Sequence, residues 1–379
     1  MRASVASIEL EDDRGAVSFR TEDGVPSRMS PMSYPELGTR TAEIRNRLAA
    51  AGAVLNPGEG LAQALTQAEV VARNNGPVRG IPQHEFLANA RACTAMWDLA
   101  GMLRTCDTRG LNMTAHLRNI TTGTVDFGVP AAPNSQSHYF KDFQLELYVA
   151  AQCITDNVPQ VALNPVPNAP DGDLYLETLR CEIKHPNSLG QLSDYLKKFN
   201  KALQDRNLYG VFVTGIEDMF SVFPPEMFPD DAAFQAWLTQ KRQEADFYAR
   251  TFFRMAAGRD RILATVQLWS FWYQAGGAVS LHREGNAIAF DHRAGIPAQQ
   301  QQDAERIARV FNPHFRRWTQ IETAVQNLIS DSERTRLRES LHKKAYQIWQ
   351  GEGEPREGRA LANWLQAKSD YGLVLNTTF

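Results

Sequence analysis

The chain has few cysteines and none of the short motifs that mark the commonest catalytic sites. Its four cysteines are scattered, with no C-x-x-C pair and no zinc-type spacing, which favours buried free thiols. It contains no G-x-x-x-x-G-K-[ST] phosphate loop, no G-x-S-x-G nucleophile elbow and no H-E-x-x-H pair. These absences argue against the usual NTPase, α/β-hydrolase and metalloprotease sites.

Long apolar runs and a strong charge of either sign are also missing. No apolar stretch reaches the roughly 18 residues that a membrane span needs, and the N-terminus lacks a signal-peptide pattern. The formal net charge is −3, so nothing in the overall balance indicates nucleic acid or an acidic membrane as a partner. We therefore expect a cytoplasmic protein without a membrane partner, in which any polyanion site is a local basic groove.

Four regions follow one another in the 379 residues. Residues 1–38 mix charge, Ser, Pro and Gly and predict a flexible or loosely docked leader. Residues 39–112 have helical periodicity, residues 113–295 mix helix and strand patterns, and residues 296–379 are predicted as helical throughout. The alternating, Thr- and Val-rich segment 111–130 predicts a strand or hairpin.

The middle region has the order of an α/β unit. An amphipathic helix over 137–154 precedes a hairpin over 172–188, a helix that begins near Ser188 and a strongly apolar strand over 208–216. After it come a long amphipathic helix and two or three aromatic-rich strands between residues 230 and 292. The sequence predicts an α/β fold in which a mixed sheet is flanked by helices.

The hairpin "GDLYLETLRCEIKHPNS" carries the residues that indicate chemistry. Glu182 and Lys184 are two apart on the second strand and project from one face, whereas Cys181 and Ile183 face the core. Asp173, at the start of the first strand, can reach the same place. Two converging carboxylates repel unless a cation lies between them, and Mg²⁺ takes oxygen ligands of this kind. Such a site suits phosphodiester hydrolysis.

An isolated E-x-K triplet is a weak signal, so the neighbouring polar residues matter. Glu146 lies beside the apolar face of the preceding helix, where a carboxylate is costly without a partner. Gln191 and Tyr195 are four apart and share one face of the following helix. Glu177, in the same hairpin, has no place in this set and is predicted to face solvent.

The set Glu146, Asp173, Glu182-Ile183-Lys184 and Gln191-x-x-x-Tyr195 resembles the PD-(D/E)xK nuclease superfamily, which has the restriction-endonuclease-like fold. The last element resembles the Q-x-x-x-Y motif of the RecB-type branch. The resemblance implies that Asp173, Glu182 and the main-chain carbonyl of Ile183 bind Mg²⁺ or Mn²⁺. It implies that Lys184 positions water or stabilises the phosphate, and that Glu146 completes the acidic cluster.

Nucleic-acid contacts are also implied by the resemblance and by nearby basic residues. Gln191 and Tyr195 would contact the backbone or orient the lysine. Lys197, Lys198 and Lys201 would supply phosphate contacts, although a solvated helix face explains them equally well. DNA is the expected substrate and RNA is not excluded. The iron–sulfur clusters of some RecB-type nucleases do not fit, because no cysteine follows Cys181.

The C-terminal stretch carries a second resemblance, to a small bacterial helical-hairpin domain of unestablished function, over residues 338–372. The resemblance rests on one set of positions: Ala345, Tyr346, Trp349, Gly353, Pro355, Gly358, Trp364 and Leu365. We expect two helices joined by a Gly/Pro turn, with Tyr346, Trp349 and Trp364 packed between them. Such a module indicates a partner protein or a homodimer.

Three functions stay open at this point. The first is a metal-dependent nuclease, endonuclease or exonuclease, of the kind that serves in restriction, anti-phage defence or repair. The second is a catalytically degenerate nuclease fold that binds nucleic acid or assists assembly. The third is an ordinary hairpin with the real site elsewhere, for instance in a hydrolase. In the first, Asp173 and Glu182 must approach closely enough to share one cation.

Overall fold

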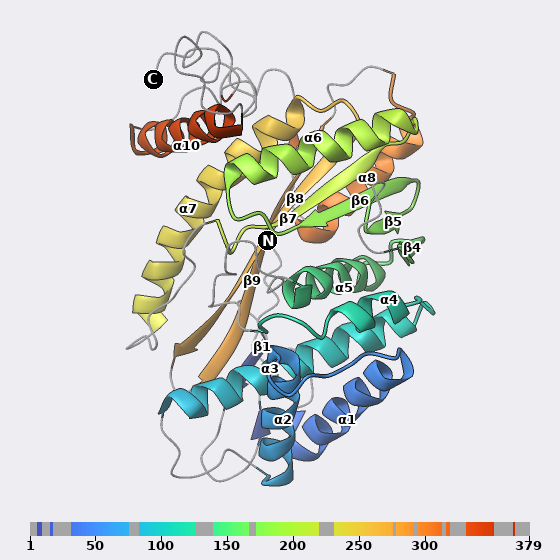
Figure 1. Cartoon of the computed structure of the whole chain (residues 1–379), viewed down its shortest axis with the longest axis vertical. Coiled ribbons are helices and arrows are strands. Elements are labelled where there is room, and N and C mark those ends of the chain that lie inside the picture. Colours follow the sequence, from blue (N-terminus) through green and yellow to red (C-terminus); the bar gives the residue numbers. More distant parts are fainter. Residues whose placement is uncertain are drawn as a thin grey trace.

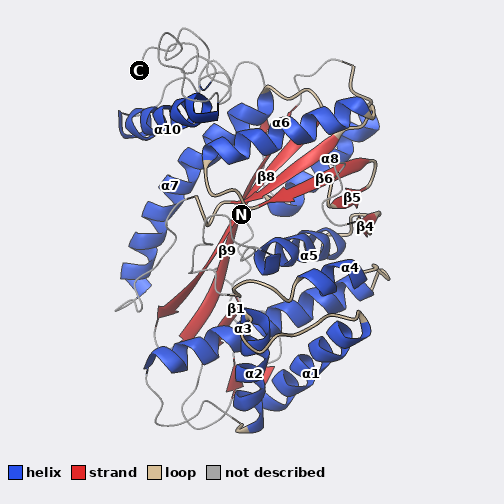
Figure 2. Cartoon of the chain, viewed as in Figure 1, coloured by secondary structure: helices blue, strands red, loops and turns tan. Residues whose placement is uncertain are grey.

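A computed structural model shows the α/β architecture that the sequence predicts (Figures 1 and 2). One mixed sheet lies between helices that cover both of its faces. The structure describes one set of residues: 6–9, 16–17, 32–75, 83–125, 139–166, 172–219, 231–275, 278–290, 295–312, 316–318, 331–351 and 367.

The main sheet has the strand order β1-β9-β8-β7-β6-β5-β4, and β10 also pairs with β9. Strands β6, β7 and β8 run parallel at its centre, while β4, β5 and β6 form an antiparallel edge. The strands of this sheet have the following bounds: β1 Ala6–Glu9, β4 Val161–Leu163, β5 Leu174–Leu176, β6 Leu179–Lys184, β7 Gly210–Gly215, β8 Ile262–Ala275, β9 Ala278–Phe290 and β10 Arg316–Trp318. A separate pair joins β2 (Ala16–Val17) to β3 (Met32–Ser33).

Two helices, α6 (Leu189–Asp205) and α7 (Asp231–Ala257), cover one face of the sheet. Phe199 of α6 and Phe252 of α7 both pack on Phe212 of β7, and the ring centroids are 6.0 Å apart in each pair. Because β7 is buried along its whole length, it reads as a continuous apolar run.

The opposite face is covered by α5 (Tyr139–Thr155) and α8 (Ala298–Phe311). The apolar face predicted for α5 is buried as expected. Its members are Phe140, Phe143, Leu147, Ala150 and Ile154. Burial of this face against the sheet fixes the side of α5 that carries Glu146.

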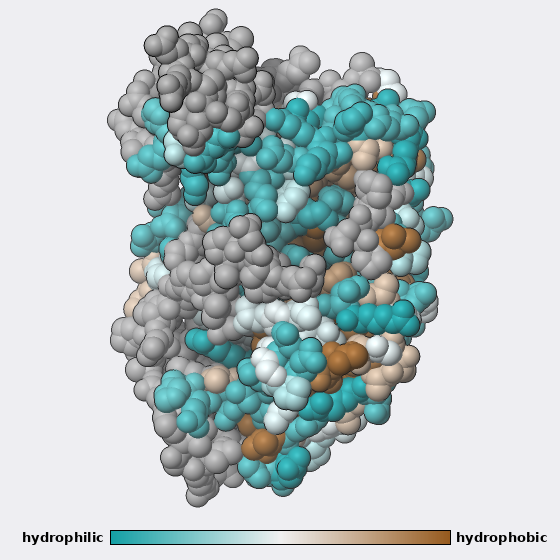
Figure 3. All heavy atoms as spheres, viewed as in Figure 1, coloured by the Kyte–Doolittle hydropathy of each residue, from teal (hydrophilic) through white to brown (hydrophobic). Residues whose placement is uncertain are grey.

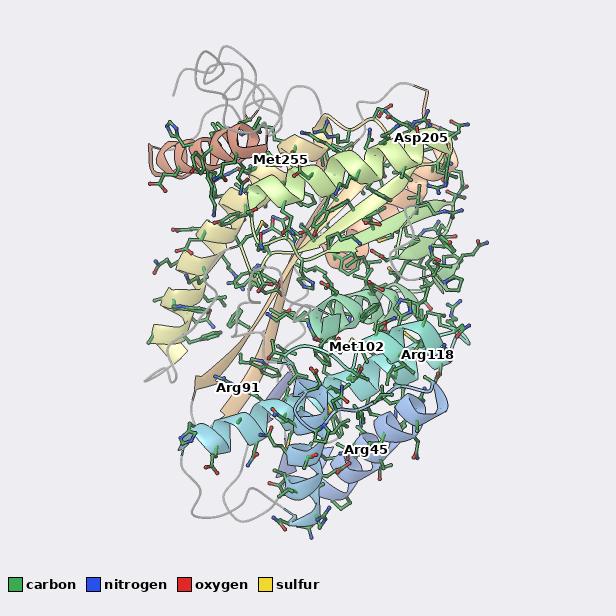
Figure 4. The ribbon with its side chains drawn as sticks, in the orientation of Figure 1. Arg45, Arg91, Met102, Arg118, Asp205 and Met255 are labelled. Carbon is green, nitrogen blue, oxygen red and sulfur yellow. The ribbon has the colours of Figure 1, made fainter. Side chains whose placement is uncertain are left out.

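Four further helices, α1 (Tyr34–Ala50), α2 (Gly60–Arg73), α3 (Gln83–Asp107) and α4 (Thr114–Asn119), form a layer beyond α5. Polar contacts join them: Arg45 of α1 pairs with Glu69 of α2, and the guanidinium of Arg118 donates to the carbonyl of Ala51 at 2.5 Å (Figure 4). Helix α3 packs on α5 and on β9, and these contacts join the helical N-terminal region to the α/β unit.

Three secondary-structure predictions differ from the structure. Residues 114–119, inside the segment predicted as a strand, form the short helix α4. Residues 6–9, inside the predicted leader, pair with β9 as an edge strand. Residues 316–318, in the region predicted as entirely helical, form β10. Both of these strands pair with β9, which is distant in sequence, so local patterns could not reveal them.

Helix α10 (Asp331–Gly351) supplies the first helix of the predicted C-terminal hairpin. Its Tyr346 is 55% exposed, although we expected it to pack inside that hairpin. Residues 352–366, which hold the predicted turn and most of the second helix, lie outside the described residues. Hydrophilic side chains spread over much of the face seen in Figure 3, and none of the described helices is long and apolar enough to cross a membrane.

Candidate active site

The hairpin β5–β6 places its polar residues as the alternation predicts. Along β6 the residues alternate between buried and half-buried, so that Cys181 and Ile183 point into the core while Glu182 and Lys184 share the other face. Asp173 lies next to β6, because its N–H donates to the carbonyl of Cys181 at 2.7 Å. Gly172 permits this approach: a Cβ there would lie 2.7 Å from the same carbonyl, and its φ is +114°.

The ammonium group of Lys184 joins the two carboxylates of the hairpin. Its Nζ lies 3.0 Å from Oδ2 of Asp173 and 2.8 Å from Oε1 of Glu182. Oδ2 of Asp173 also accepts the N–H of Ile183 at 2.7 Å. In an extended strand the N–H and C=O of one residue point the same way, so the Ile183 carbonyl also faces the Asp173 side.

Glu146 approaches this cluster from α5 and is buried. Its Oε2 lies 2.7 Å from Nε2 of His116, on α4. The pKa of His116 is lowered to about 4 by burial, so its imidazole is neutral near pH 7. One proton therefore lies between the imidazole and the carboxyl group. His116 was missed from the sequence because its segment was predicted as a strand, and only the buried Glu146 hinted at a partner.

The acids of the cluster are held in a costly environment. Burial raises the pKa of Glu146 well above its ordinary value, and the negative charge of Asp173 raises it further. Burial also raises the pKa of Asp173, more than Lys184 and the Ile183 N–H lower it. The two carboxylates in turn raise the pKa of Lys184. The site thus holds more acid than one lysine can neutralise, which is the condition that attracts a second cation.

The Q-x-x-x-Y element lies on α6 beside these charges. Ser188 caps α6 by accepting the N–H of Gln191, whose side-chain oxygen accepts the N–H of Asn187 at 2.8 Å. Nε2 of Gln191 donates to the hydroxyl of Tyr195 at 2.9 Å. Burial raises the pKa of Tyr195. The positive charge of Lys184 lowers this pKa, and the negative charge of Glu182 raises it. Gln191 therefore fixes the start of α6 and orients Tyr195.

The three lysines predicted as phosphate contacts lie further along α6, on different faces. Lys198 is exposed and follows Gln191 and Tyr195 on one face at helical spacing. Lys201 is 75% exposed at its side chain and pairs with Asp205 one turn away. Lys197 is half-buried. Of the three, Lys198 alone shares a helix face with Gln191 and Tyr195.

A second polar group supports the end of β6. Nδ1 of His185 lies 2.8 Å from Oδ1 of Asp142, on α5, and its Nε2 lies 3.7 Å from Oε2 of Glu217, which follows β7. His185 is buried. The two carboxylates raise the pKa of His185 against the effect of burial. This group ties α5, β6 and β7 together directly behind Lys184.

Glu177 was predicted to face solvent, and this prediction is wrong. Its side chain is only 10% exposed and pairs with Arg306 on α8. Its φ of +55° places it in the left-handed region at the tight turn between β5 and β6. All four cysteines are buried and free, as predicted.

The donor set at the hairpin fits a hard divalent cation. Asp173 and Glu182 each place a carboxylate oxygen within 3.0 Å of one ammonium group, and carboxylate oxygens are the ligands that a hard divalent cation takes. Among the described residues no three His, Cys, Asp or Glu side chains form a ready-made metal cluster. A cation held between those same two oxygens would displace the Lys184 ammonium.

Comparison with known proteins gives no match. No protein-family model, no curated protein and no solved structure is significantly similar to this chain.

Proposed function

We propose that the chain is a divalent-metal-dependent nuclease of the PD-(D/E)xK type, with a restriction-endonuclease-like core, that hydrolyses phosphodiester bonds in DNA. The observation that carries the proposal is the pairing of Asp173 and Glu182 with Lys184 at the end of a parallel strand. The antiparallel edge β4–β5–β6, the crossover helix α6 and the parallel strand β7 are consistent with such a core.

In this proposal Asp173, Glu182 and the main-chain carbonyl of Ile183 hold Mg²⁺ or Mn²⁺, and Glu146 extends the acidic cluster. A bound divalent ion would neutralise the charge that develops on the phosphate and help to activate the attacking water. Because its pKa is raised, Lys184 stays protonated at neutral pH and acts as a donor to the phosphate or to the water.

The remaining neighbours position these groups. Tyr195 interacts electrostatically with Lys184 and Glu182, and Gln191 orients its hydroxyl group. It can therefore donate to a phosphate oxygen of the substrate. His116 holds the Glu146 carboxyl group in place through its Nε2. Behind the strand, His185 fixes the direction in which Lys184 leaves β6, because Asp142 holds its ring.

A cleavage assay with the purified full chain tests the proposal. Circular and linear DNA, single- and double-stranded, and RNA are incubated with Mg²⁺ or Mn²⁺ and with EDTA. We expect metal-dependent cleavage of DNA that Glu182→Gln and Lys184→Ala reduce by at least about 100-fold, which matches the loss of one charge-stabilising group. Asp205→Asn, an exposed acid at the far end of α6, is the matched control and leaves the rate unchanged.

Two results would refute the proposal. One is the absence of cleavage of every substrate with either metal, which would favour a degenerate fold that only binds. The other is cleavage that Glu182→Gln and Lys184→Ala leave unchanged, which would place the site elsewhere. Loss of linear substrate while the circular form survives would identify an exonuclease.

A further inference from the structure

A cavity of about 520 Å³ opens at the edge of the sheet, next to the turn of the β5–β6 hairpin that carries the candidate site. Its walls are formed by residues of the loop that joins α5 to β4, of β4 and of the β5–β6 hairpin, together with Arg109. Cavities of this size bind small ligands or single nucleotide-sized groups. Nothing in the roles assigned above uses it.

Two arginines and a tyrosine give this cavity its chemistry. Arg180 of β6 lies directly opposite Tyr175 of β5, and its guanidinium carbon is 4.3 Å from the centre of the tyrosine ring. Arg109, which follows α3, reaches the same cavity and donates to the carbonyl of Pro159 at 3.3 Å. Among the described residues of the lining, Glu177 is the one acid, and it is paired with Arg306. The described part of the lining therefore carries excess positive charge beside a stacked aromatic and guanidinium pair.

The cavity continues the strand face that carries the acids. Arg180, Glu182 and Lys184 alternate with buried residues along β6, so all three project from one face. Successive residues on one strand face are about 6.6 Å apart, a distance of the order of one nucleotide step. Asp173, directly before β5, and Tyr175 of β5 are also two residues apart; Tyr175 lies opposite Arg180, and the N–H of Asp173 donates to the carbonyl of Cys181.

We propose that this cavity, the Arg180 pocket, binds an unpaired nucleotide of the substrate strand next to the phosphate that is cut. The base stacks on the outer side of the Tyr175–Arg180 pair, because an aromatic or guanidinium plane accepts any base without reading its sequence. Arg109 binds the adjoining phosphate. The inference rests on the proposed nuclease function and adds a substrate class to it: single-stranded or frayed DNA.

Binding without catalysis tests the pocket separately from the reaction. The probe is a short fluorescein-labelled single-stranded oligothymidylate, and its binding to the full chain is followed by fluorescence anisotropy in EDTA. We expect Tyr175→Ala and Arg180→Ala to weaken binding about 5- to 100-fold, the range for loss of one base stack. Tyr175→Phe keeps the ring and keeps the affinity. Arg109→Ala weakens binding and flattens its dependence on salt.

Matched controls separate the pocket from general charge and from folding. Arg206→Ala removes an exposed arginine at the end of α6, outside the pocket, and should leave the affinity unchanged. Arg180→Lys keeps the positive charge but lacks the planar guanidinium group. Its binding should therefore retain part of its dependence on salt and lose the contribution of stacking. Circular dichroism and melting temperature verify that each variant is folded.

The following outcomes overturn the inference. Affinities of Tyr175→Ala and Arg180→Ala equal to that of the wild type would show that no nucleotide occupies the pocket. Equal weakening by Tyr175→Phe and Tyr175→Ala would assign the effect to the hydroxyl and not to the ring. A wild-type chain that binds the duplex form of the probe as well as the single strand would remove the preference for an unpaired nucleotide. Failure of the nuclease proposal is seen separately, as absence of cleavage with Mg²⁺ or Mn²⁺ in the assay above.

Discussion

Replacing Lys184 with methionine leaves the buried acids of the site without their ammonium group. At an effective dielectric constant of about 20, each contact near 3 Å corresponds to roughly 5 kcal/mol of Coulomb energy, from which the desolvation of the ammonium must be subtracted. Removal of one partner of a buried ion pair usually costs about 3–5 kcal/mol. The Lys184 side chain is 22% exposed, so we expect Lys184→Met to lower the free energy of unfolding by about 3 kcal/mol at pH 8 in EDTA.

The loss should depend on pH with a definite sign. The pKa of Asp173 and that of Glu146 are already raised in the folded chain, and removal of Lys184 takes away a charge that lowers both. When the pKa of a carboxyl group is higher in the folded than in the unfolded chain, the free energy of unfolding falls as pH rises from the unfolded pKa to the folded pKa. The destabilisation by Lys184→Met should therefore be largest at pH 8 and shrink as pH falls toward about 4.5, near the ordinary carboxyl pKa.

Urea unfolding at several pH values, with and without Mg²⁺, measures both effects. If the carboxylates hold a divalent ion, Mg²⁺ should restore more stability to Lys184→Met than it adds to the wild type. Lys198→Met, an exposed lysine on α6, is the matched control and should show neither effect. A Lys184→Met chain as stable as the wild type at pH 8 in EDTA, or one equally destabilised at pH 4.5, would refute this account of the site.

Three further predictions concern buried groups. Glu146→Gln should stabilise the metal-free chain above about pH 5, because burial raises the pKa of Glu146 and ionisation then costs stability; the check is the slope of unfolding free energy against pH. Arg283→Met should destabilise the chain by about 3–5 kcal/mol in urea unfolding, since it leaves the Asp98 carboxylate, now bonded at 2.7 and 2.5 Å, without its partner. The four buried thiols should react with a thiol reagent at pH 8 only after unfolding, as burial raises the pKa of Cys93 and of Cys106 to about 12.

The sequence predicted the elements whose signals are local. Alternation along 179–184 identified β6, and the sequence predicted a helix that begins near Ser188, the residue that caps α6 in the structure. The same local rules placed Asp173 beside Glu182, because a tight hairpin turn sets the register. The part of the site that lies on one hairpin and one helix was therefore accessible from sequence alone.

The parts of the site that depend on contacts between distant segments could not be predicted from the sequence. The segment around His116 is rich in Thr and Val and was predicted as a strand, yet residues 114–119 form a helix that packs on α5. This packing brings His116 to Glu146, thirty positions away, and no periodicity encodes such a pairing. Glu177 shows the same limit, because its partner Arg306 comes from a helix more than a hundred residues later.

The energetic costs in this α/β unit gather at one place. Asp173, Glu146 and Glu217 are buried carboxyl groups whose pKa values are raised chiefly by burial. Asp173 and Glu217 contact Lys184 and His185 at the end of β6, and the charges of Asp173 and Lys184 act on the pKa of Glu146. Well-packed apolar residues of similar size would usually be as stable or more stable in such positions. A chain selected for stability alone has no reason to keep them, and local rules are broken mainly where a site requires it. Their concentration around Lys184, on the strand face that leads to the Arg180 pocket, favours a catalytic site over an ordinary hairpin.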